Sequence, residues 1–207
     1  MKKILYLISP RKIKKSFYNN FEIVLKKNKV KYFQLRLKNT KKSKIITISK
    51  KIRNITRKYN VKFIMNDDYK IAKKVKADGC HIGQLDGDVS LVRNYLKGKI
   101  IGVTCHNSAS LAKKAIAKGA DYIALGSFYS SKLKPKAKKA EIKNLIKIRS
   151  IIKKPIVAIG GVNNRNFKNL LNNGANYIAL SSFIWDNKVF KPEEAINKFY
   201  EDYSKWN

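Results

Sequence analysis

Short apolar runs alternate along this chain with lysine-rich segments of helical spacing, and this alternation is what most constrains the fold. Each run ends in small or polar residues and is followed by a segment such as SLAKKAIAKGA, in which a glycine marks the helix end. Buried strands that alternate with crossover helices form a parallel sheet. The predicted strands are residues 4–9, 30–36, 61–66, 79–83, 99–104, 121–126, 155–160 and 176–181.

Eight strands in 207 residues fit a single (β/α)₈ TIM barrel over residues 1–207, near the lower size limit of that fold. The alternative, an open doubly wound sheet, expects a glycine-rich fingerprint after the first strand. SPRKIKK stands there instead. Since the chain shows no linker, low-complexity tract or second domain, the sequence predicts one α/β barrel.

The first ten residues, MKKILYLISP, combine a basic start with a short apolar part that ends at Pro10. This part is too short for a secretory signal, so we expect a strand there. No apolar run reaches the ~18 residues of a membrane span. The two cysteines, Cys80 and Cys105, lack the spacing of a zinc site. We therefore expect a reduced, cytoplasmic setting without a membrane partner.

The formal net charge of +34 raises the question of nucleic-acid binding. Of the 47 basic residues 40 are lysine, which reads phosphates and bases less well than bidentate arginine, and they are spread along the whole chain. We expect weak, nonspecific adhesion to polyanions and no specific nucleic acid as partner. Nothing in the sequence indicates an oligomeric state.

Acidic residues are scarce and unevenly placed. The chain has 13, and five of them fall between residues 67 and 88. Asp67 and Asp86 follow neighbouring predicted strands, which run ~4.8 Å apart in a sheet. Two carboxylates so placed suit Mg²⁺ together with substrate phosphate oxygens. The alternative makes Asp67 a helix N-cap and Asp86 a turn former, roles for which Asp68 and Asp88 are better placed.

The groups that act on substrate in such barrels lie at the carboxyl ends of the strands. Gly160 and Gly161 follow the seventh strand, and Ser181 and Ser182 follow the eighth. These segments can expose backbone N–H groups to a phosphate, the alternative being a tight turn and a helix cap. The other polar residues expected on this rim are Gln34, Arg36, Lys38, Asn66, Asp67, Gln84, Asp86, Thr104 and His106.

The rim offers no convincing nucleophile. Cys105 and His106 are adjacent, so their side chains point to opposite sides of a strand. His81 has an apolar neighbour on each side, which favours a core histidine bonded to the backbone over a catalytic base. Arg36, one of seven arginines, is a stronger candidate than Lys38, which taken alone is more simply a solvated surface residue.

Five stretches of the chain resemble, in order, the motifs of the thiamine-phosphate synthase family. They are FQLRLK, FIMNDDYKIAKKVKADGCHIGQLDGD, IIGVTCHNS, GADYIALGSFYSSKLK and PIVAIGGVNNRNFKNLLNNGANYIALSS, and they span most of residues 30–185. The resemblance implies a TIM-barrel transferase that uses Mg²⁺ and small phosphorylated substrates. Such an enzyme joins 4-amino-2-methyl-5-(diphosphooxymethyl)pyrimidine to a thiazole phosphate, which gives thiamine phosphate and pyrophosphate.

The resemblance also implies individual roles. The pyrimidine diphosphate would be bound by Gln34, Leu35, Arg36, Leu37, Lys38, Asn66, Thr104 and Lys134. The thiazole phosphate would be bound by Ser131, Lys132, Leu133, Gly161, Ser181 and Ser182, and Mg²⁺ by Asp67 and Asp86. Pyrophosphate would leave before the thiazole nitrogen captures the pyrimidine methyl cation. That order needs stabilisation of negative charge more than a general base, so the catalytic residues would be Arg36, Lys38 and Lys134.

Two alternative functions stay open at this point. A thiazole tautomerase on the same barrel would need neither Mg²⁺ nor the pyrimidine substrate. The presence of Asp67 and Asp86, together with Gln34, Arg36 and Lys38, counts against it. A noncatalytic polyanion-binding protein is favoured by the net charge alone.

The loop after the sixth strand departs from the family pattern. The family usually has Pro-Thr-x-Thr-Lys, whereas this chain has Ser130-Ser131-Lys132-Leu133-Lys134. The side chain of Leu133 cannot donate a hydrogen bond, a loss of ~0.5–1.5 kcal/mol in affinity for the thiazole phosphate unless Lys132 compensates. The loop would otherwise serve a different ligand.

Substitution Leu133→Thr is predicted to lower the KM for thiazole phosphate, because it restores a hydroxyl donor to this loop. Steady-state kinetics at saturating pyrimidine diphosphate measure the effect. An unchanged or higher KM would show that Leu133 is not a defect.

Overall fold

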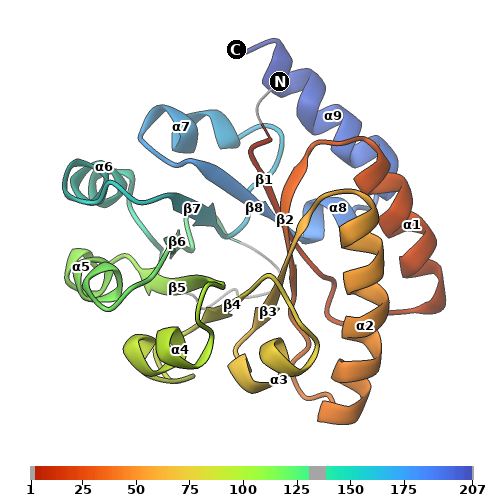
Figure 1. Ribbon diagram of the computed structural model, residues 1–207. Coiled ribbons are helices and arrows are strands. Elements are labelled where there is room, and N and C mark those ends of the chain that lie inside the picture. Colours follow the sequence, from red (N-terminus) through yellow and green to blue (C-terminus); the bar gives the residue numbers. More distant parts are fainter. Residues whose placement is uncertain (1–2, 131–138, 207) are drawn as a thin grey trace.

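In a computed structural model, eight parallel strands close into one barrel in the order β1 to β8 (Figure 1). The structure describes residues 3–130 and 139–206. Closure comes from pairing of the first strand with the last, Leu5 with Ile178 and Leu7 with Leu180. The predicted barrel is therefore confirmed. The strands are β1 Leu5–Ile8, β2 Val30–Leu35, β3 Lys62–Asn66, β4 Gly79–Ile82, β5 Ile100–His106, β6 Tyr122–Gly126, β7 Ile156–Ile159 and β8 Tyr177–Leu180.

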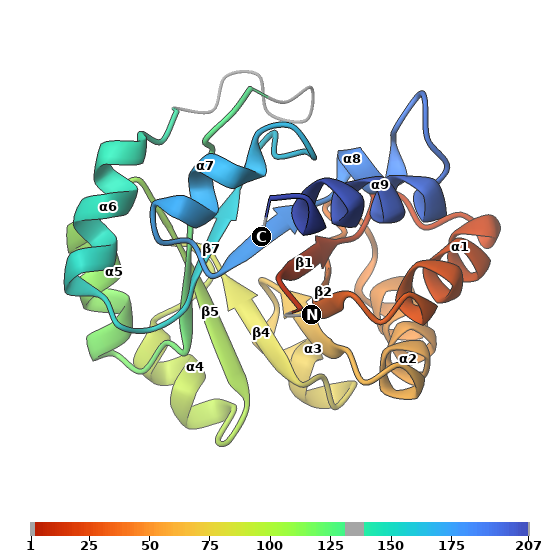
Figure 2. The same cartoon turned by 90° about the horizontal axis from the view of Figure 1, so that it is seen from above.

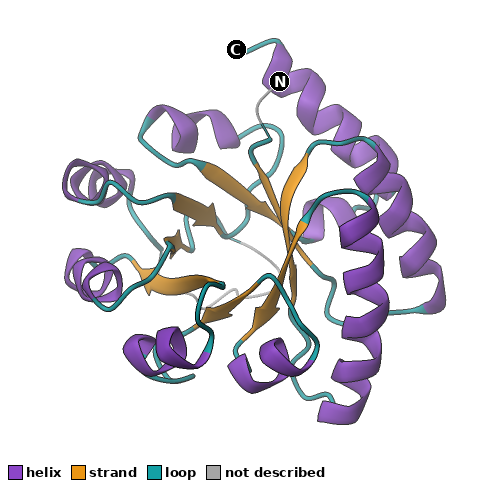
Figure 3. Cartoon of the chain, in the orientation of Figure 1, coloured by secondary structure: helices purple, strands orange, loops and turns teal. Residues whose placement is uncertain are grey.

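Helices form the outer ring around the strands, as Figure 3 shows by colour. The last helix, α9, packs against α1 and α8. None of the described helices has the length and apolar character of a bilayer span. The helices are α1 Lys15–Lys26, α2 Lys42–Lys58, α3 Tyr69–Lys74, α4 Val89–Tyr95, α5 Ala109–Ala117, α6 Ile142–Ile151, α7 Phe167–Asn172, α8 Ser182–Trp185 and α9 Pro192–Ser204.

Alternate residues of each strand face two different apolar layers, because side chains of a strand point to opposite sides. Residues such as Phe33, Leu35 and Cys80 belong to the large layer between the strands and the helices. The second, smaller layer fills the barrel itself. Its buried members are Tyr6, Ile8, Tyr122, Ala124, Val157 and Ala179.

A glycine in β5 makes room for a tyrosine in the barrel interior. A Cβ atom added at Gly102 would lie 1.9 Å from Cζ of Tyr122 and 2.2 Å from its hydroxyl oxygen. Tyr122 is only 3% exposed and crosses the interior to reach Tyr6, with 2.7 Å between the two hydroxyl oxygens. The missing side chain at residue 102 therefore determines where the Tyr122 hydroxyl lies.

Substitution Gly102→Ala is predicted to lower the free energy of unfolding by about 1–3 kcal/mol, because the added methyl group overpacks the interior against Tyr122. Urea unfolding followed by circular dichroism measures this. Gly98→Asn is the matched control: Gly98 has a φ of +70°, which asparagine tolerates, and an added Cβ there meets nothing within 4 Å. Equal stability of the two variants would contradict the overpacking argument.

Candidate active site

The carboxyl ends of all eight strands meet at one end of the barrel, because the strands are parallel and the sheet is closed. Figure 2, turned by 90° from Figure 1, shows the strands of the barrel from the side. Gln34 and Asn66 lie at the ends of β2 and β3, and Thr104 lies near the end of β5. The structure therefore brings the described rim candidates to one end. Ser131, Lys132, Leu133 and Lys134 lie outside the described residues.

Asp67 and Asp86 come together at this end. The Asp67 carboxyl lies within hydrogen-bonding reach of the Asp86 carboxyl and forms an ion pair with Lys38. Asp86 also accepts a hydrogen bond from the Gly83 N–H at 2.7 Å. Burial raises the pKa of the Asp67 carboxyl above its usual range, and the Asp86 carboxylate raises it further, whereas Lys38 opposes both effects. The carboxyl groups of Asp67 and Asp86 thus lie side by side in a half-buried position at the rim.

Asp68 and Asp88, which lie near this pair in the sequence, are the N-caps of the helices that follow. Asp68 accepts a hydrogen bond from the Ile71 N–H at 2.8 Å and caps α3. Asp88 accepts one from the Ser90 N–H at 2.9 Å and caps α4. Asp67 and Asp86 therefore cap neither α3 nor α4, although Asp86 does stabilise the turn after β4 through the Gly83 N–H.

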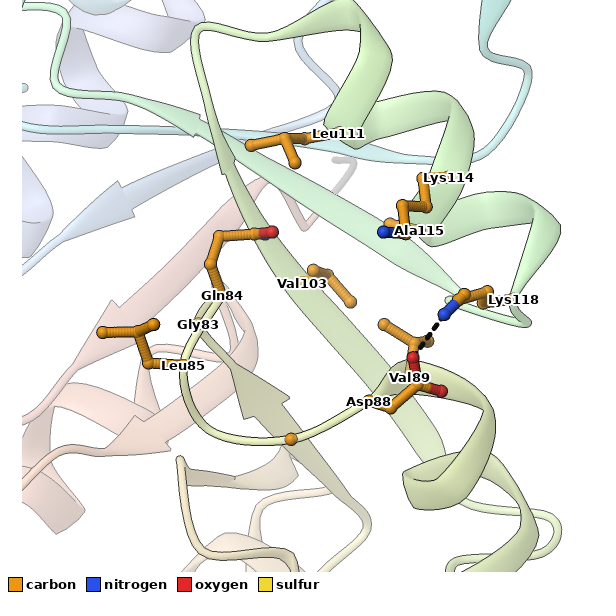
Figure 4. Close-up of a pocket in the computed structure, with 11 residues that line it drawn as sticks. Gly83, Gln84, Leu85, Asp88, Val89, Val103, Leu111, Lys114, Ala115 and Lys118 are labelled. Carbon is orange, nitrogen blue, oxygen red and sulfur yellow. Dashed lines mark hydrogen bonds and ion pairs between the residues drawn. The ribbon is translucent and has the colours of Figure 1, made fainter.

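The loop that carries Asp86 is braced against β5. The Gln84 side-chain amide donates a hydrogen bond to the Thr104 carbonyl at 2.5 Å. Beside this loop a cavity of ≈ 340 Å³ opens toward α5, and the ion pair between Asp88 and Lys118 lines it (Figure 4). Leu85, at the tip of the loop, is 99% exposed. Gln84 thus helps to fix the position of the acidic pair.

The glycine pair after β7 has a structural reason to be glycine. Gly160 and Gly161 have φ angles of +103° and +62°, and a Cβ at Gly161 would lie 2.5 Å from the Ser130 carbonyl oxygen. A Cβ at Gly160 would lie 2.0 Å from the Ser127 hydroxyl oxygen. The segment after β6 therefore lies directly on the glycine backbone. At the end of β8, the Ser181 hydroxyl donates to the Ser9 carbonyl at 3.2 Å.

The residues from Leu35, at the end of β2, onward lie in two different environments. The side chain of Leu35 is buried in the outer apolar layer, so a contact of this residue with a substrate would come from its backbone. Leu37 also packs against that layer. Arg36 is half-buried, and its guanidinium has no partner within the described part of the chain. A cationic group without a partner is available to a phosphate.

His81 is buried at 7% exposure, as expected, but the expectation of backbone partners was wrong. Its two ring nitrogens face side chains, the Tyr122 hydroxyl at 3.0 Å and the Thr104 hydroxyl at 2.8 Å. Burial lowers the pKa of His81 to about 4. Sequence reasoning also missed Tyr6 and Tyr122, which connect His81 to Gln34. The only sequence signal for these two tyrosines was a polar residue inside an apolar run. That signal is weak because both faces of a barrel strand are buried, so the pattern does not show which side chains face the interior.

The cysteine and histidine at the end of β5 do not form a nucleophile pair. Cys105 is fully buried, His106 is exposed, and burial raises the pKa of the Cys105 thiol to about 12. Among the described residues no group of three or more His, Cys, Asp or Glu side chains could hold a metal ion by itself. The titratable groups that the described residues bring together at this rim are the acidic pair and Lys38.

The family model described as thiamine monophosphate synthase matches residues 5–184. The chain belongs to the thiamine monophosphate synthase family. The thiamine-phosphate synthase of Pelagibacter ubique is 52% identical over 198 residues, which cover 95% of this chain and 96% of that protein. The thiamine-phosphate synthase of Saccharophagus degradans is 38% identical over 179 residues, 85% of this chain and 82% of that protein. The family membership predicted from the motifs is confirmed, and with it the class of enzyme, a transferase.

Solved structures agree with this assignment. The thiamine phosphate pyrophosphorylase of Pyrococcus furiosus superposes with a TM-score of 0.87 at 28% identity and covers 98% of this chain and 96% of that one. The orotidine 5'-phosphate decarboxylase of Pyrococcus horikoshii, at 15% identity and a TM-score of 0.68, covers 95% of this chain and 98% of that one. The second likeness shows the barrel fold alone.

The raised pKa of Asp67 predicts how Asp67→Asn changes stability with pH. Folding makes this carboxyl bind its proton more tightly, so it favours the fold below its unfolded pKa, near 3.8, and that contribution is lost as the pH rises through the folded pKa. The asparagine side chain stays neutral and tolerates the φ of 64° at this position. The unfolding free energy of the variant relative to the parent chain should therefore increase as the pH rises above the unfolded pKa of Asp67, near 3.8.

Urea unfolding at a series of pH values measures this difference between the two proteins. A difference that shrinks or reverses as the pH rises would show that the ion pair with Lys38 outweighs burial and the Asp86 carboxylate.

Proposed function

We propose that this chain is a thiamine-phosphate synthase that joins 4-amino-2-methyl-5-(diphosphooxymethyl)pyrimidine to thiazole phosphate. The observation that carries the proposal is the meeting of Asp67 and Asp86 beside Lys38 at the carboxyl end of the barrel. A thiazole tautomerase has no use for two such carboxylates. The homologous synthases from P. ubique and S. degradans support the same activity.

The acidic pair fits a magnesium ion. Mg²⁺ prefers oxygen ligands and usually takes one or two carboxylates together with substrate phosphate oxygens. Two carboxyl groups in mutual reach, with the pKa of Asp67 raised, leave negative charge that a divalent cation would neutralise. Asp67 and Asp86 would hold the ion, which when bound would neutralise charge on the diphosphate as a Lewis acid.

The protein's own cations would bind and stabilise the leaving pyrophosphate. Arg36, whose guanidinium has no partner in the described residues, and Lys38, beside Asp67, extend from the segment after β2. Lys134 would contribute a third charge. The carbon–oxygen bond between the pyrimidine methylene group and the diphosphate would break first, with both electrons leaving on the diphosphate. Fixed positive charges lower the free energy of that charge separation because they need no reorganisation.

The thiazole phosphate would be held at the ends of β7 and β8, which lie across the mouth from β3 and β4 and their acidic pair. Gly161, Ser181 and Ser182 lie at the ends of β7 and β8, and Ser131 to Leu133 would complete this set, although they lie outside the described residues. Their role is to keep the thiazole nitrogen within about 3–3.5 Å of the cationic carbon, where its lone pair forms the new carbon–nitrogen bond. No general base is needed for this step.

The setting follows from the same chemistry. Cys80 and Cys105 are free, buried thiols, which suits the reducing cytoplasm, where small phosphorylated precursors are handled. The diphosphate substrate is itself a small polyanion, and the high positive charge would attract it at low salt. We propose no nucleic-acid partner.

The deciding assay supplies the purified protein with both substrates and Mg²⁺ and measures thiamine phosphate and pyrophosphate. Equal amounts of both products are expected. Absence of product, with and without Mg²⁺, would remove the proposal and leave the tautomerase and the noncatalytic protein as alternatives.

Substitutions Asp67→Asn and Asp86→Asn are each predicted to lower turnover at least about tenfold, because each removes a carboxylate ligand of the metal. Asp68→Asn is the matched control: it changes a neighbouring carboxylate but keeps an N-cap for α3, and turnover should stay near that of the parent chain. Near-normal turnover in both of the first two variants would retire the assignment of the metal ligands.

A further inference from the structure

A continuous row of hydrogen bonds runs through the barrel interior and joins two of the predicted substrate-binding residues. The Gln34 amide nitrogen lies 3.1 Å from the Tyr6 hydroxyl, which lies 2.7 Å from the Tyr122 hydroxyl. The Tyr122 hydroxyl lies 3.0 Å from Nδ1 of His81, and Nε2 of His81 lies 2.8 Å from the Thr104 hydroxyl. The row uses one residue from each of five strands. We call these five residues the interior row.

The three central members of the interior row are sealed from water. Tyr6, Tyr122 and His81 are 2%, 3% and 7% exposed. Burial raises the pKa of both tyrosine hydroxyls and lowers the pKa of His81 to about 4. At neutral pH each central residue is therefore neutral and contributes a single proton to the row. Buried polar groups of this kind need all their hydrogen bonds satisfied from within the protein.

Counting protons leaves two arrangements. Four hydrogen bonds need one proton each, and each central residue supplies one, so the fourth proton must come from Gln34 or from Thr104. If Gln34 donates, then Tyr6 donates to Tyr122, Tyr122 donates to Nδ1 of His81, and Nε2–H of His81 donates to Thr104. If Thr104 donates, every bond reverses and the amide oxygen of Gln34 must accept from Tyr6. The direction at one end thus determines the direction at the other.

The structure places the nitrogen of Gln34, and not its oxygen, against Tyr6, which selects the first arrangement. The Gln34 oxygen has no partner in the described part of the chain, where no buried side-chain oxygen lacks one, so this oxygen contacts solvent. Thr104 accepts from His81 and keeps its own hydroxyl proton. We propose that Tyr6, Tyr122 and His81 are positioning residues that hold Gln34 as a hydrogen-bond acceptor and Thr104 as a donor toward the substrate.

An acceptor at Gln34 and a donor at Thr104 match the pyrimidine substrate. This part of the inference rests on the proposed function, which identifies that substrate. The substrate carries an amino group, which needs an acceptor, and a diphosphate, which needs donors. The reversed row would offer an amide donor at Gln34 and a hydroxyl without a free proton at Thr104. Both contacts would then be mismatched, and an unmatched buried polar contact costs more than a missing one.

Nitrogen NMR of the protein labelled with ¹⁵N-histidine tests the direction of the row without any substrate. The chain has two histidines, and His106→Asn assigns their signals. The inference expects His81 to carry its proton on Nε2 between about pH 6 and pH 8, with Nδ1 as an unprotonated acceptor. A proton on Nδ1 in the parent protein would overturn it.

Substitution Gln34→Glu at pH 8 tests the coupling along the row. A carboxylate can only accept, so it forces Tyr6 to donate toward it, and the His81 proton should move from Nε2 to Nδ1. The double variant Gln34→Glu with Tyr6→Phe is the matched control: the row is cut, and the proton should stay on Nε2. An unchanged tautomer in Gln34→Glu, or the same change in the double variant, would contradict transmission through Tyr6 and Tyr122.

Steady-state kinetics test the consequence for the substrate. Tyr122→Phe removes one hydroxyl and is expected to lower kcat/KM for the pyrimidine diphosphate about tenfold, while the KM for thiazole phosphate is unchanged. Tyr177→Phe is the control, because its hydroxyl bonds Tyr32 inside the barrel but outside the interior row, and neither constant should change. Equal effects on both substrates would indicate general loss of structure. If the parent chain makes no product, the proposed function fails, while the NMR result still decides the row.

Discussion

Closure of the sheet is the constraint on which the rest of this structure depends. Pairing of β1 with β8 turns eight separate strand ends into one rim, although the residues that pair are far apart in the chain. A side-chain hydrogen bond also stabilises the closure, because the indole N–H of Trp185 donates to the Ile8 carbonyl at 2.8 Å. Without this closure the glycines after β7 and the cations after β2 would lie at opposite edges of an open sheet.

The closed barrel then makes its interior the route by which distant rim residues influence one another. Glycine at residue 102 lets the ring of Tyr122 occupy the centre, where its hydroxyl meets groups from β1 and β4. A large side chain opposite a small one is ordinary packing in a small barrel. Here the pairing also places a hydroxyl that joins β1 to β4 and, through them, β2 to β5. The same glycine–tyrosine pair therefore determines both the packing of the barrel interior and the hydrogen bonds that reach Gln34 and Thr104 at the rim.

The sequence was sufficient for the architecture because strand and helix signals repeat eight times and every repeat supports the same sheet. Asp67 and Asp86 could also be paired in advance, since they follow consecutive strands and the nearby Asp68 and Asp88 fill the capping roles. The hydrogen-bond partners of His81 could not be predicted from the sequence. In a barrel both faces of a strand are buried, so alternation of apolar residues does not show which side chains face inward. Tyr122 is 41 residues from His81, and only the closed geometry brings them together.

The acidic pair has a further property that the charge of the chain makes informative. Most exposed acids here lie beside a lysine or arginine, as Asp88 lies beside Lys118 and Asp121 beside Arg93. Asp86 has no ion pair within the described residues and lies instead against the Asp67 carboxyl. In a chain of net charge +34, a carboxylate held away from lysines and near another carboxylate is costly unless a cation joins it. Lys38 neutralises one of the two charges, and the other is the charge that the magnesium ion of the proposed function would neutralise.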